Sequence, residues 1–221
     1  EDQNDVIGIG TGNGPILIQN QGDIFNPDFL VSRVKITRED NKNYADYLLA
    51  DEQINAIVVD GGNRKWVGTT SSGLYLLSDD GTETLEHFTT ENSPLSSNYI
   101  MDLALSKETG ELMIATSTGL FSFMTDATEG KESYSEVYAY PNPVRETFDG
   151  VISVIGLMEN SLVRITDSEG KVVHEDYSNG GTFTWNGRDK NGRKVSTGVY
   201  FVFAAIEDGS SKMVTKIAII K

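Results

Sequence analysis

Short segments in which apolar and polar residues alternate run along the whole chain, and turns rich in glycine and asparagine separate them. Alternation with a period of two and turn signals about every ten residues predict antiparallel β-strands. The chain has 22 glycines and only 5 prolines, which fits many tight turns between short strands better than a helical bundle. The pattern therefore predicts an all-β protein.

The alternating segments repeat in the first part of the chain. When Ile54 is placed on Ile100, a spacing of 46 residues, the aligned pairs are Ile54/Ile100, Ile57/Leu103, Val59/Leu105, Gly73/Gly119, Leu74/Leu120 and Tyr75/Phe121. A third copy at residues 7–18 places Gly10 and Thr11 opposite Gly68 and Thr69, and "KITREDN" continues it, 52 residues before "HFTTENS". A repeat of about 40 to 50 residues made of such strands predicts the blades of a β-propeller.

The number of copies bears on whether the propeller closes. Two complete copies and part of a third cannot form a ring, because propellers usually need at least about four blades. We therefore predict two to three blades of an incomplete ring over residues 1–130, completed by upstream sequence or by other chains. Open strand edges would favour such pairing.

The second part of the chain has a different pattern. Residues 126–137 are polar and lack apolar periodicity, so we expect a linker at 131–137. Seven short apolar segments then follow between 138 and 221, separated by turn signals that include Asp208-Gly209. This predicts a seven-stranded immunoglobulin-like β-sandwich, here without a disulfide because the chain has no cysteine.

The distribution of charge supports a boundary between these parts. Residues 1–137 hold 23 acidic and 8 basic residues, whereas residues 138–221 hold 10 of each. The change indicates a domain boundary near 130–140, and the acidic part argues against a nucleic-acid groove. No apolar run approaches the roughly 20 residues that a membrane-spanning helix needs.

Candidate chemistry is sparse. Asp189 begins a segment, "DKNGR", that resembles half of a calcium loop, but position twelve of that loop is Tyr200, so we favour a turn stabilised by Asp and Asn side chains. The basic residues Arg188, Lys190, Arg193 and Lys194 are either a solvated hairpin tip or a docking site for an anionic ligand. His87 and His174 lack a recognisable nucleophile, and nothing marks one carboxylate pair above the others. We predict no catalytic residue, metal or cofactor.

One repeat resembles the two-component-regulator propeller family. The matching residues in the copy from Ile54 are Ile54, Ile57, Asp60, Trp66, Gly68, Thr69, Gly73 and Leu74. The next copy departs from the family at Ser106, Met113 and Ala115, which replace the Asp, the Trp and the Gly. The resemblance therefore implies propeller blades and does not imply chemistry at those positions.

The neutral part resembles the C-terminal sorting domain of the type IX secretion system of Bacteroidetes-type bacteria. The matching positions are Tyr140, Pro141, Asn142, Pro143, Asp167, Gly170, Trp185, Gly187, Asp189, Gly192, Gly198, Tyr200, Lys216 and Lys221. The Trp-x-Gly-x-Asp-x-x-Gly segment is shared with an immunoglobulin-like domain of flagellar hook-capping proteins. The preceding propeller and the terminal position favour the sorting domain, which implies export to the outer membrane, the cell surface or the periplasm.

Three hypotheses of function follow. The first is a non-enzymatic envelope protein similar to the propeller-bearing member of the type IX attachment complex. That resemblance implies secretion and attachment proteins as partners, with anionic lipopolysaccharide or another glycan as a further candidate ligand. The second is an exported enzyme or adhesin whose active region lies upstream. The third is a polysaccharide sensor ectodomain, which the strand-like "KIAIIK" ending disfavours because a sensor would continue into a membrane span.

Overall fold

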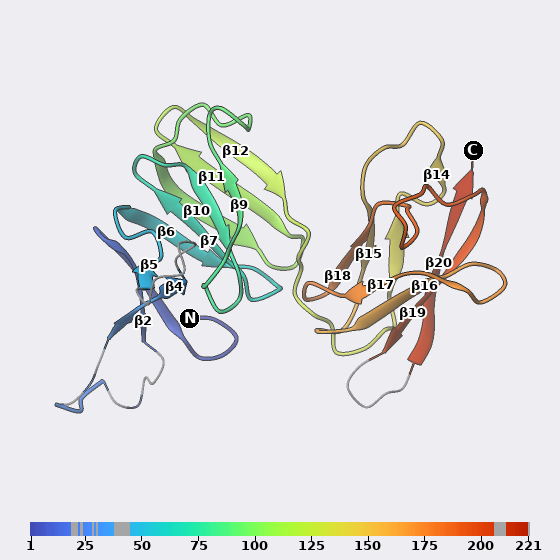
Figure 1. The fold of residues 1–221 in the computed structure, drawn as a ribbon, viewed down its shortest axis with the longest axis horizontal. Coiled ribbons are helices and arrows are strands. Elements are labelled where there is room, and N and C mark those ends of the chain that lie inside the picture. The colour runs from blue at the N-terminus through green and yellow to red at the C-terminus, as the bar shows by residue number, and fades with distance from the viewer. Residues whose placement is uncertain are drawn as a thin grey trace. The chain divides into compact units, whose positions relative to one another are not determined.

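The computed structural model describes residues 1–18, 22, 24–27, 29, 31–37, 45–205 and 211–220. The regular elements of this part are β-strands (Figure 1), so the predicted all-β class is confirmed. The chain divides into two compact units. Unit 1 comprises residues 1–106 and 111–124, and unit 2 comprises residues 107–110 and those from 125 onward. Within the described ranges, no helix has the length and apolar character needed to cross a membrane.

Unit 1 contains one four-stranded antiparallel sheet, which we call blade B. Each of its three turns has a residue with positive φ: Asn63 at 60°, Gly73 at 85° and Gly81 at 71°. Glycine adopts this backbone region readily, and asparagine tolerates it better than most residues do. The strands are β6 (Ile54–Val59), β7 (Lys65–Thr69), β8 (Leu74–Leu77) and β9 (Thr84–Phe88), hydrogen-bonded in that order.

The next sheet, blade C, repeats the first three strands of blade B. Its strands are β10 (Ile100–Ser106), β11 (Glu111–Thr116) and β12 (Gly119–Met124). The first ladder has a register shift between Ile54 and Ala56 in blade B, and a matching shift between Ile100 and Asp102 in blade C. The predicted spacing of 46 residues therefore aligns equivalent strands and equivalent bulges.

Blade A is formed by β1 (Ile7–Thr11), β2 (Gly14–Ile18) and β3 (Ser32–Arg33), and the hairpin of β4 (Lys35–Thr37) and β5 (Ala45–Tyr47) follows it. The Oγ1 of Thr11 donates to the carbonyl of Gly14 at 2.6 Å. Thr69 makes the same bond to Gly73 in blade B, and Thr116 makes it to Gly119 in blade C. This shared bond shows that β1 and β2 of blade A are equivalent in the repeat to β7 and β8 of blade B. Part of the aligned "KITREDN" segment lies outside the described residues.

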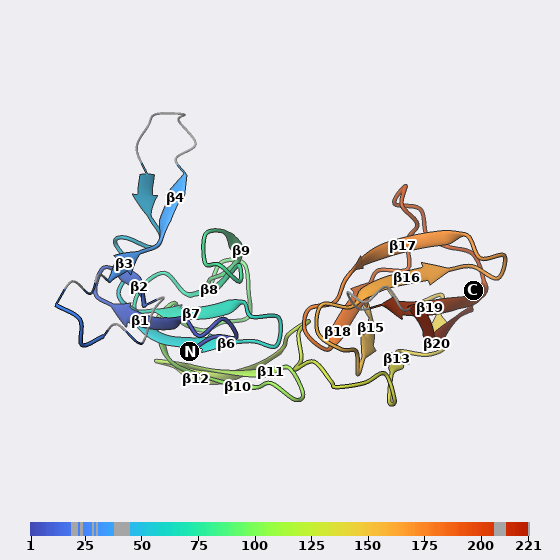
Figure 2. The same ribbon diagram turned by 90° about the horizontal axis from the view of Figure 1, so that it is seen from below.

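The blades pack face to face through apolar side chains. In Figure 2 the sheet of blade C lies against blade B. Buried side chains of the two sheets, among them Trp66, Leu74 and Ile100, form one shared core. A glycine allows the closest approach: a Cβ at Gly68 would lie 2.6 Å from Cγ2 of Ile100. Gly10 meets Ile54 in the same way across blades A and B, at 2.8 Å.

The prediction of incomplete propeller blades is confirmed. The sequence repeat predicted three strands in each copy, whereas blade B has a fourth, β9. β9 was missed because its short segment, Thr84–Phe88, is mostly exposed and carries only a weak apolar alternation.

Unit 2 is a β-sandwich built of two sheets over a common core. The larger sheet has the order β14 (Val144–Arg145), β20 (Ser211–Ile220), β19 (Gly198–Ala205), β16 (Leu162–Thr166) and β17 (Val172–Tyr177). The smaller sheet has the order β13 (Tyr138–Tyr140), β15 (Ile152–Ile155) and β18 (Thr182–Trp185). Buried side chains from both sheets, among them Val154, Ile165, Trp185, Val202 and Ile217, form its core.

The first predicted segment of the sandwich contains two strands instead of one, so the described part of unit 2 has eight strands. β13 belongs to the smaller sheet, while β14 pairs in parallel with β20 in the larger one. Pro141 and Pro143 lie between them, each after a cis peptide bond. Proline has no N–H for a strand ladder, so the chain leaves one sheet there and joins the other.

The predicted linker is packed against the sandwich. The Lys131 N–H donates to the carbonyl of Leu157, and the hydroxyls of Tyr134 and Ser161 lie 2.8 Å apart. The domain limits 1–130, 131–137 and 138–221 stay a prediction. The predicted turn at Asp208-Gly209 lies outside the described residues.

Candidate functional site

The segment with the predicted basic tip is a tight turn organised by Asp189. Its Oδ1 accepts the N–H groups of Asn191 and Arg193, each at 2.9 Å. The Asp189 N–H also donates to the Arg193 carbonyl, and Gly192 has a φ of 76°. These backbone hydrogen bonds hold the pKa of the Asp189 carboxyl below its ordinary value. The carboxylate therefore stabilises the turn.

Two other turns have the same construction. Oδ1 of Asp60 accepts the N–H groups of Gly62 and Arg64 in blade B. Oδ1 of Asp167 accepts those of Glu169 and Lys171 in the sandwich. The sequence predicted the turn at Asp189 from its Asp and Asn residues, while Asp60 and Asp167 are matching positions of the propeller and sorting-domain families.

The four predicted docking residues surround the turn at Asp189. Lys190, Arg193 and Lys194 are exposed, and Arg188 is partly buried. Arg188 donates from Nη1 to the Gly192 carbonyl. Lys194 pairs with Asp149 at 2.8 Å, with both side chains largely exposed. An ion pair in that setting contributes little, so Lys194 can exchange it for an anionic ligand.

The aromatic residues of the sorting motif support this turn from inside the sandwich. Trp185 is 1% exposed, and its Nε1 donates to the Arg188 carbonyl at 2.8 Å. The Tyr200 ring lies 5.7 Å from the Trp185 ring, and its hydroxyl donates to the Ser196 carbonyl. Burial raises the pKa of Tyr200, so the hydroxyl stays protonated at neutral pH. The motif therefore links the core to the base of the basic tip.

The glycines of the motif differ in their roles. Gly187 has a φ of 69°, which favours glycine, as at Gly192. Gly198 has no such φ, and a Cβ there would lie 3.8 Å from the Tyr200 ring, which is an ordinary contact, so neither a positive φ nor a close approach requires glycine at this position.

Asn142 of the sorting motif contacts β20, the strand that contains Lys216. Asn142 lies between Pro141 and Pro143, donates to the Lys216 carbonyl at 2.8 Å and accepts from the Ala218 N–H at 3.0 Å. The Asn142 amide thus takes the place of backbone pairing where the chain passes between the sheets. Lys221 lies outside the described residues.

A cavity of about 420 Å³ lies beside the basic tip. Its apolar lining includes Phe148, Ile152 and Ile219, and its charged lining includes Arg145, Asp149 and Lys194. The tip and this cavity form one continuous surface of unit 2.

Unit 1 has a separate cavity of about 250 Å³ with an apolar floor and an acidic rim, which the sequence did not predict. The floor includes Val34, Leu48, Val67 and Leu77, and the rim carries Glu1, Asp2, Asp79 and Asp80. This arrangement suits a ligand group that is both apolar and positively charged.

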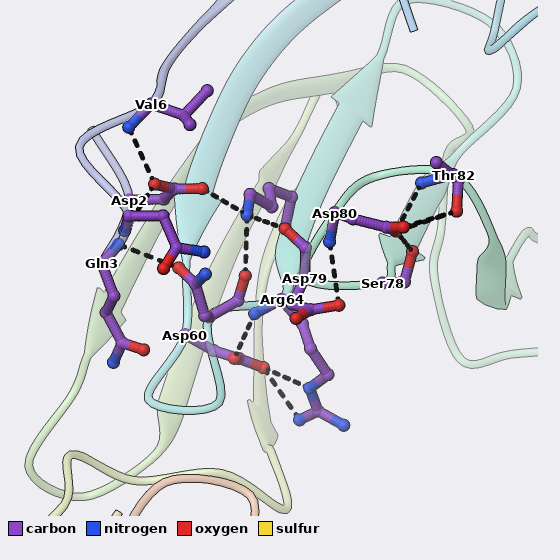
Figure 3. Close-up of polar contacts among 12 residues, drawn as sticks. Asp2, Gln3, Val6, Asp60, Arg64, Ser78, Asp79, Asp80 and Thr82 are labelled. Atoms are coloured by element: carbon purple, nitrogen blue, oxygen red, sulfur yellow. Dashed lines mark hydrogen bonds and ion pairs between the residues drawn. The ribbon is translucent and has the colours of Figure 1, made fainter. Parts of the chain in front are cut away.

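Lys65 joins the segment before β1 to blade B at the edge of this cavity, and Figure 3 labels two of its partners, Asp2 and Asp79. Its Nζ donates to Oδ2 of Asp2 at 2.6 Å, to the Asn63 carbonyl at 2.9 Å and to the Asp79 carbonyl. Burial raises the pKa of Asp2, but hydrogen bonds from Lys65, Val6 and Asn4 outweigh it and leave the pKa below its ordinary value. Asp2 is therefore ionised at neutral pH and neutralises Lys65.

The turn that carries Asp60 lies next to this network. Asp60 is fully buried and pairs with Arg64 through Nε at 2.9 Å and Nη2 at 2.8 Å (Figure 3). The charges of Asp60 and Arg64 offset each other, and neither side chain lines the cavity, so this pair leaves the negative charge of the rim unchanged.

The histidines lie apart, one in each unit. Nε2 of His87 lies 2.6 Å from the Ser72 carbonyl, and its ring stacks on Tyr75 at 3.9 Å. The His174 ring lies against Phe183 at 5.8 Å, and burial lowers its pKa. The His87 ring is thus engaged within blade B, whereas the His174 ring on β17 packs across the sandwich against Phe183 on β18.

Comparison with known families agrees with the site in unit 2. Residues 138–221 match the secretion system C-terminal sorting domain family, and they are a sorting domain of the type IX secretion system. The chain is therefore that of an exported protein, directed to the cell surface or outer membrane, which carries propeller blades before its sorting domain.

A solved structure extends the similarity to both units. PorZ of Porphyromonas gingivalis, described as an essential surface component of the type IX secretion system, is 35% identical, with a TM-score of 0.67. The match covers 100% of this chain and 29% of the PorZ chain. The extracellular domain of BT3049 from B. thetaiotaomicron matches at 14% identity and a TM-score of 0.42, covering 100% of this chain and 44% of that one. No curated protein sequence gave a significant match.

Proposed function

We propose that this chain is a non-enzymatic component of the type IX secretion system at the cell surface. Its blades bind a partner, and its sandwich docks on the secretion and attachment machinery. The observation that carries the proposal is the 35% identity to PorZ over both units, since PorZ is itself a surface component of that system. Similarity in the sorting domain alone would fit an exported cargo protein equally well.

The sandwich docks through its basic tip. Lys190 and Arg193 project from a turn that Asp189 holds in place, and Lys194 gives up only a weak surface pair. Clustered cations on a rigid turn attract phosphate or carboxylate groups of an envelope glycan such as anionic lipopolysaccharide. The support from Trp185 keeps the tip rigid, because it fixes the Arg188 carbonyl.

The blades use the cavity of unit 1 for a protein partner. The acidic rim attracts a positive group, and the apolar floor accepts its aliphatic part. A lysine or arginine side chain has both properties, because its stem packs on apolar surface while its head stays with charge. Glycan chains lack such a cationic head, so the two units take different ligands.

The docking proposal is tested by replacing the tip with serines. A variant with Arg188, Lys190, Arg193 and Lys194 changed to Ser is expected to lose most of its binding to purified anionic lipopolysaccharide. The matched control changes Lys107, Lys131, Lys171 and Lys212, which are exposed elsewhere in unit 2, and removes the same charge. Equal binding by both variants would remove the docking role of the tip.

The role in secretion is tested by deleting residues 138–221. The truncated chain is expected to keep the fluorescence of folded unit 1, because Trp66 lies in that unit's own core. It is also expected to fail to assemble at the surface. A truncated protein that reaches the surface and supports export would overturn the proposed function.

A further inference from the structure

The chain has four asparagines that glycine follows directly, Asn13, Asn179, Asn186 and Asn191. Asparagine is a thermolabile residue. At such a step the backbone nitrogen of the glycine attacks the side-chain amide of the asparagine, and glycine has no Cβ to hinder the attack. The reaction needs an exposed asparagine, a glycine N–H that is free of a hydrogen bond, and access for water.

Hydrogen bonds to the glycine protect two of these steps. The Gly14 N–H donates to the Glu52 carbonyl at 2.8 Å, and the Gly192 N–H donates to the Asp189 carbonyl at 2.9 Å. The nitrogen must lose its proton before it attacks, so each of these hydrogen bonds has to break first. Both steps are therefore slowed.

Burial and a carboxylate protect the third step. Gly180 is buried, and Asn179 is only partly exposed. The Nδ2 of Asn179 donates to Oδ2 of Asp126 at 3.1 Å, so the group that would leave as ammonia is held in place. Water has poor access to this step, and the departure of ammonia costs a further hydrogen bond.

The step at Asn186 has none of these protections. Asn186 is exposed, and the Gly187 N–H has no hydrogen-bond acceptor among the described residues. Both residues line the cavity of about 420 Å³ beside the basic tip, which gives water access to them. Their surroundings therefore meet all the requirements of the reaction.

The neighbours of Asn186 also favour attack on its side chain. The Arg188 N–H donates to Oδ1 of Asn186 at 3.1 Å, so a donor already faces the oxygen on which negative charge develops during the attack. The ring that this bond closes spans the Gly187 peptide, which keeps Cγ of Asn186 beside the Gly187 nitrogen. Lys194 lines the same cavity, and a nearby cation favours the deprotonated form of that nitrogen.

We propose that Asn186 is a site of spontaneous deamidation and that the reaction places a negative charge at the base of the basic tip. The Gly187 nitrogen gives its proton to hydroxide and attacks Cγ of Asn186, which closes a five-membered imide. Nδ2 takes up a proton and leaves as ammonia. Water then adds to one of the two imide carbonyls and opens the ring. The net reaction consumes one water and releases one ammonia, without oxidation or reduction.

The two ways of opening the ring have different effects on the tip. Opening at Cγ gives aspartate and changes only the charge. Opening at the main-chain carbonyl gives isoaspartate, which adds a methylene group to the backbone between Trp185 and the Arg188 carbonyl that its Nε1 holds. The negative charge of either product opposes the cations of the tip. Weaker docking of an anionic glycan is therefore expected, and this consequence rests on the proposed function.

Residue-resolved NMR tests the modification. The isotopically labelled 221-residue protein is incubated in mildly alkaline buffer, and the amide cross-peaks of Gly14, Gly180, Gly187 and Gly192 are followed over time. The original Gly187 cross-peak is expected to decay roughly fivefold faster than that of Gly192, because only Gly192 has to break a hydrogen bond before it reacts. Equal or slower decay at Gly187 would overturn the proposal.

Asn186→Gln is the matched control. Its side chain keeps the amide but has to close a six-membered ring, which is slower, so the Gly187 cross-peak should persist. Tandem mass spectrometry of the incubated wild-type protein should locate at residue 186 the mass gain that accompanies exchange of NH₂ for OH. A Gly187 cross-peak that decays equally fast in the Asn186→Gln protein, or the absence of a mass gain at residue 186, would overturn the proposal.

Docking is measured with the same samples. Incubated wild-type protein is expected to bind purified anionic lipopolysaccharide roughly fivefold more weakly than fresh protein, because the added charge offsets about one cation of the tip. The incubated Asn186→Gln protein should bind as fresh protein does. Equal binding by incubated and fresh wild-type protein would overturn the effect on docking. Failure of the fresh protein to bind would overturn the proposed docking role, whereas the cross-peaks decide the modification without any ligand.

Discussion

The contact between Gly68 and Ile100 offers a sharp test of how the blades pack. A Cβ added at Gly68 would lie 2.6 Å from Cγ2 and 3.0 Å from Cβ of Ile100, which is fully buried. Ordinary carbon contacts lie at about 3.5–4.0 Å, so Gly68→Ala is short by about 1 Å. Gly68 lies in β7, which has strands on both sides, so its backbone has little room to move.

The expected cost follows from two opposing effects. Overpacking of a core costs about 1–3 kcal/mol, while replacing glycine by alanine in a strand recovers about 0.5–1 kcal/mol. We expect a net loss of about 1–2 kcal/mol in the free energy of unfolding of unit 1. Gly8→Ala is the matched control, because its Cβ would meet its nearest atom, on Leu17, at an ordinary 3.9 Å.

A second substitution identifies the atom responsible. Ile100→Ala removes Cγ2, the atom that the new Cβ would approach most closely. The loss of unfolding free energy caused by Ile100→Ala should therefore be smaller, by about 1 kcal/mol, in the Gly68→Ala protein than in the wild-type protein. Ile100→Val keeps a γ-methyl group at that point and should show no such coupling. Urea unfolding followed by tryptophan fluorescence in a Trp185→Phe background measures unit 1, because the chain has two tryptophans and Trp66 is the other. Equal stability of Gly68→Ala and Gly8→Ala would refute the described packing.

Three further predictions concern the polar contacts. Lys65→Met is expected to destabilise unit 1 by about 2 kcal/mol in urea unfolding, because it leaves the Asp2 carboxylate, which is 4% exposed, without its cationic partner. Adding Asp2→Asn to this variant should restore part of the lost stability, because it removes the unpaired charge. Asn142→Ala is expected to cost unit 2 about 1–2 kcal/mol through its two lost bonds to β20, as measured by Trp185 fluorescence. The pKa of Asp189 is lowered in the folded state, so its stabilisation is present above the ordinary value of about 3.9 and is lost as pH falls through the folded pKa. The amide shifts of Asn191 and Arg193 should therefore titrate with a midpoint below that value, and a midpoint at or above it would contradict the turn.

The sequence predicted the elements that depend on local pattern. The strands around Trp66 and Met113 followed from the alternation of apolar residues, and the turn at Asp189 followed from its Asp, Asn and Gly residues. The passage of the chain between sheets at Pro141 and Pro143 was missed, because one apolar segment spans both strands. The choice of sheet depends on pairing with β20, which lies far along the chain.

The site in unit 1 could not be found from the sequence. Asp2 and Lys65 are 63 residues apart, and nothing in either neighbourhood indicates that they meet. Their contact requires blades A and B to be stacked first. The basic tip, in contrast, was visible because its four cations lie within seven residues of one turn.

The central claim is that this chain serves the secretion system itself and is more than a cargo of it. The most direct measurement is the fate of other proteins that carry the sorting domain, in a strain that lacks this chain. We expect such proteins to accumulate in the periplasm, and the wild-type chain to restore their appearance at the cell surface. Normal surface display of those proteins in the deletion strain would show that the chain is only cargo, and would contradict the account.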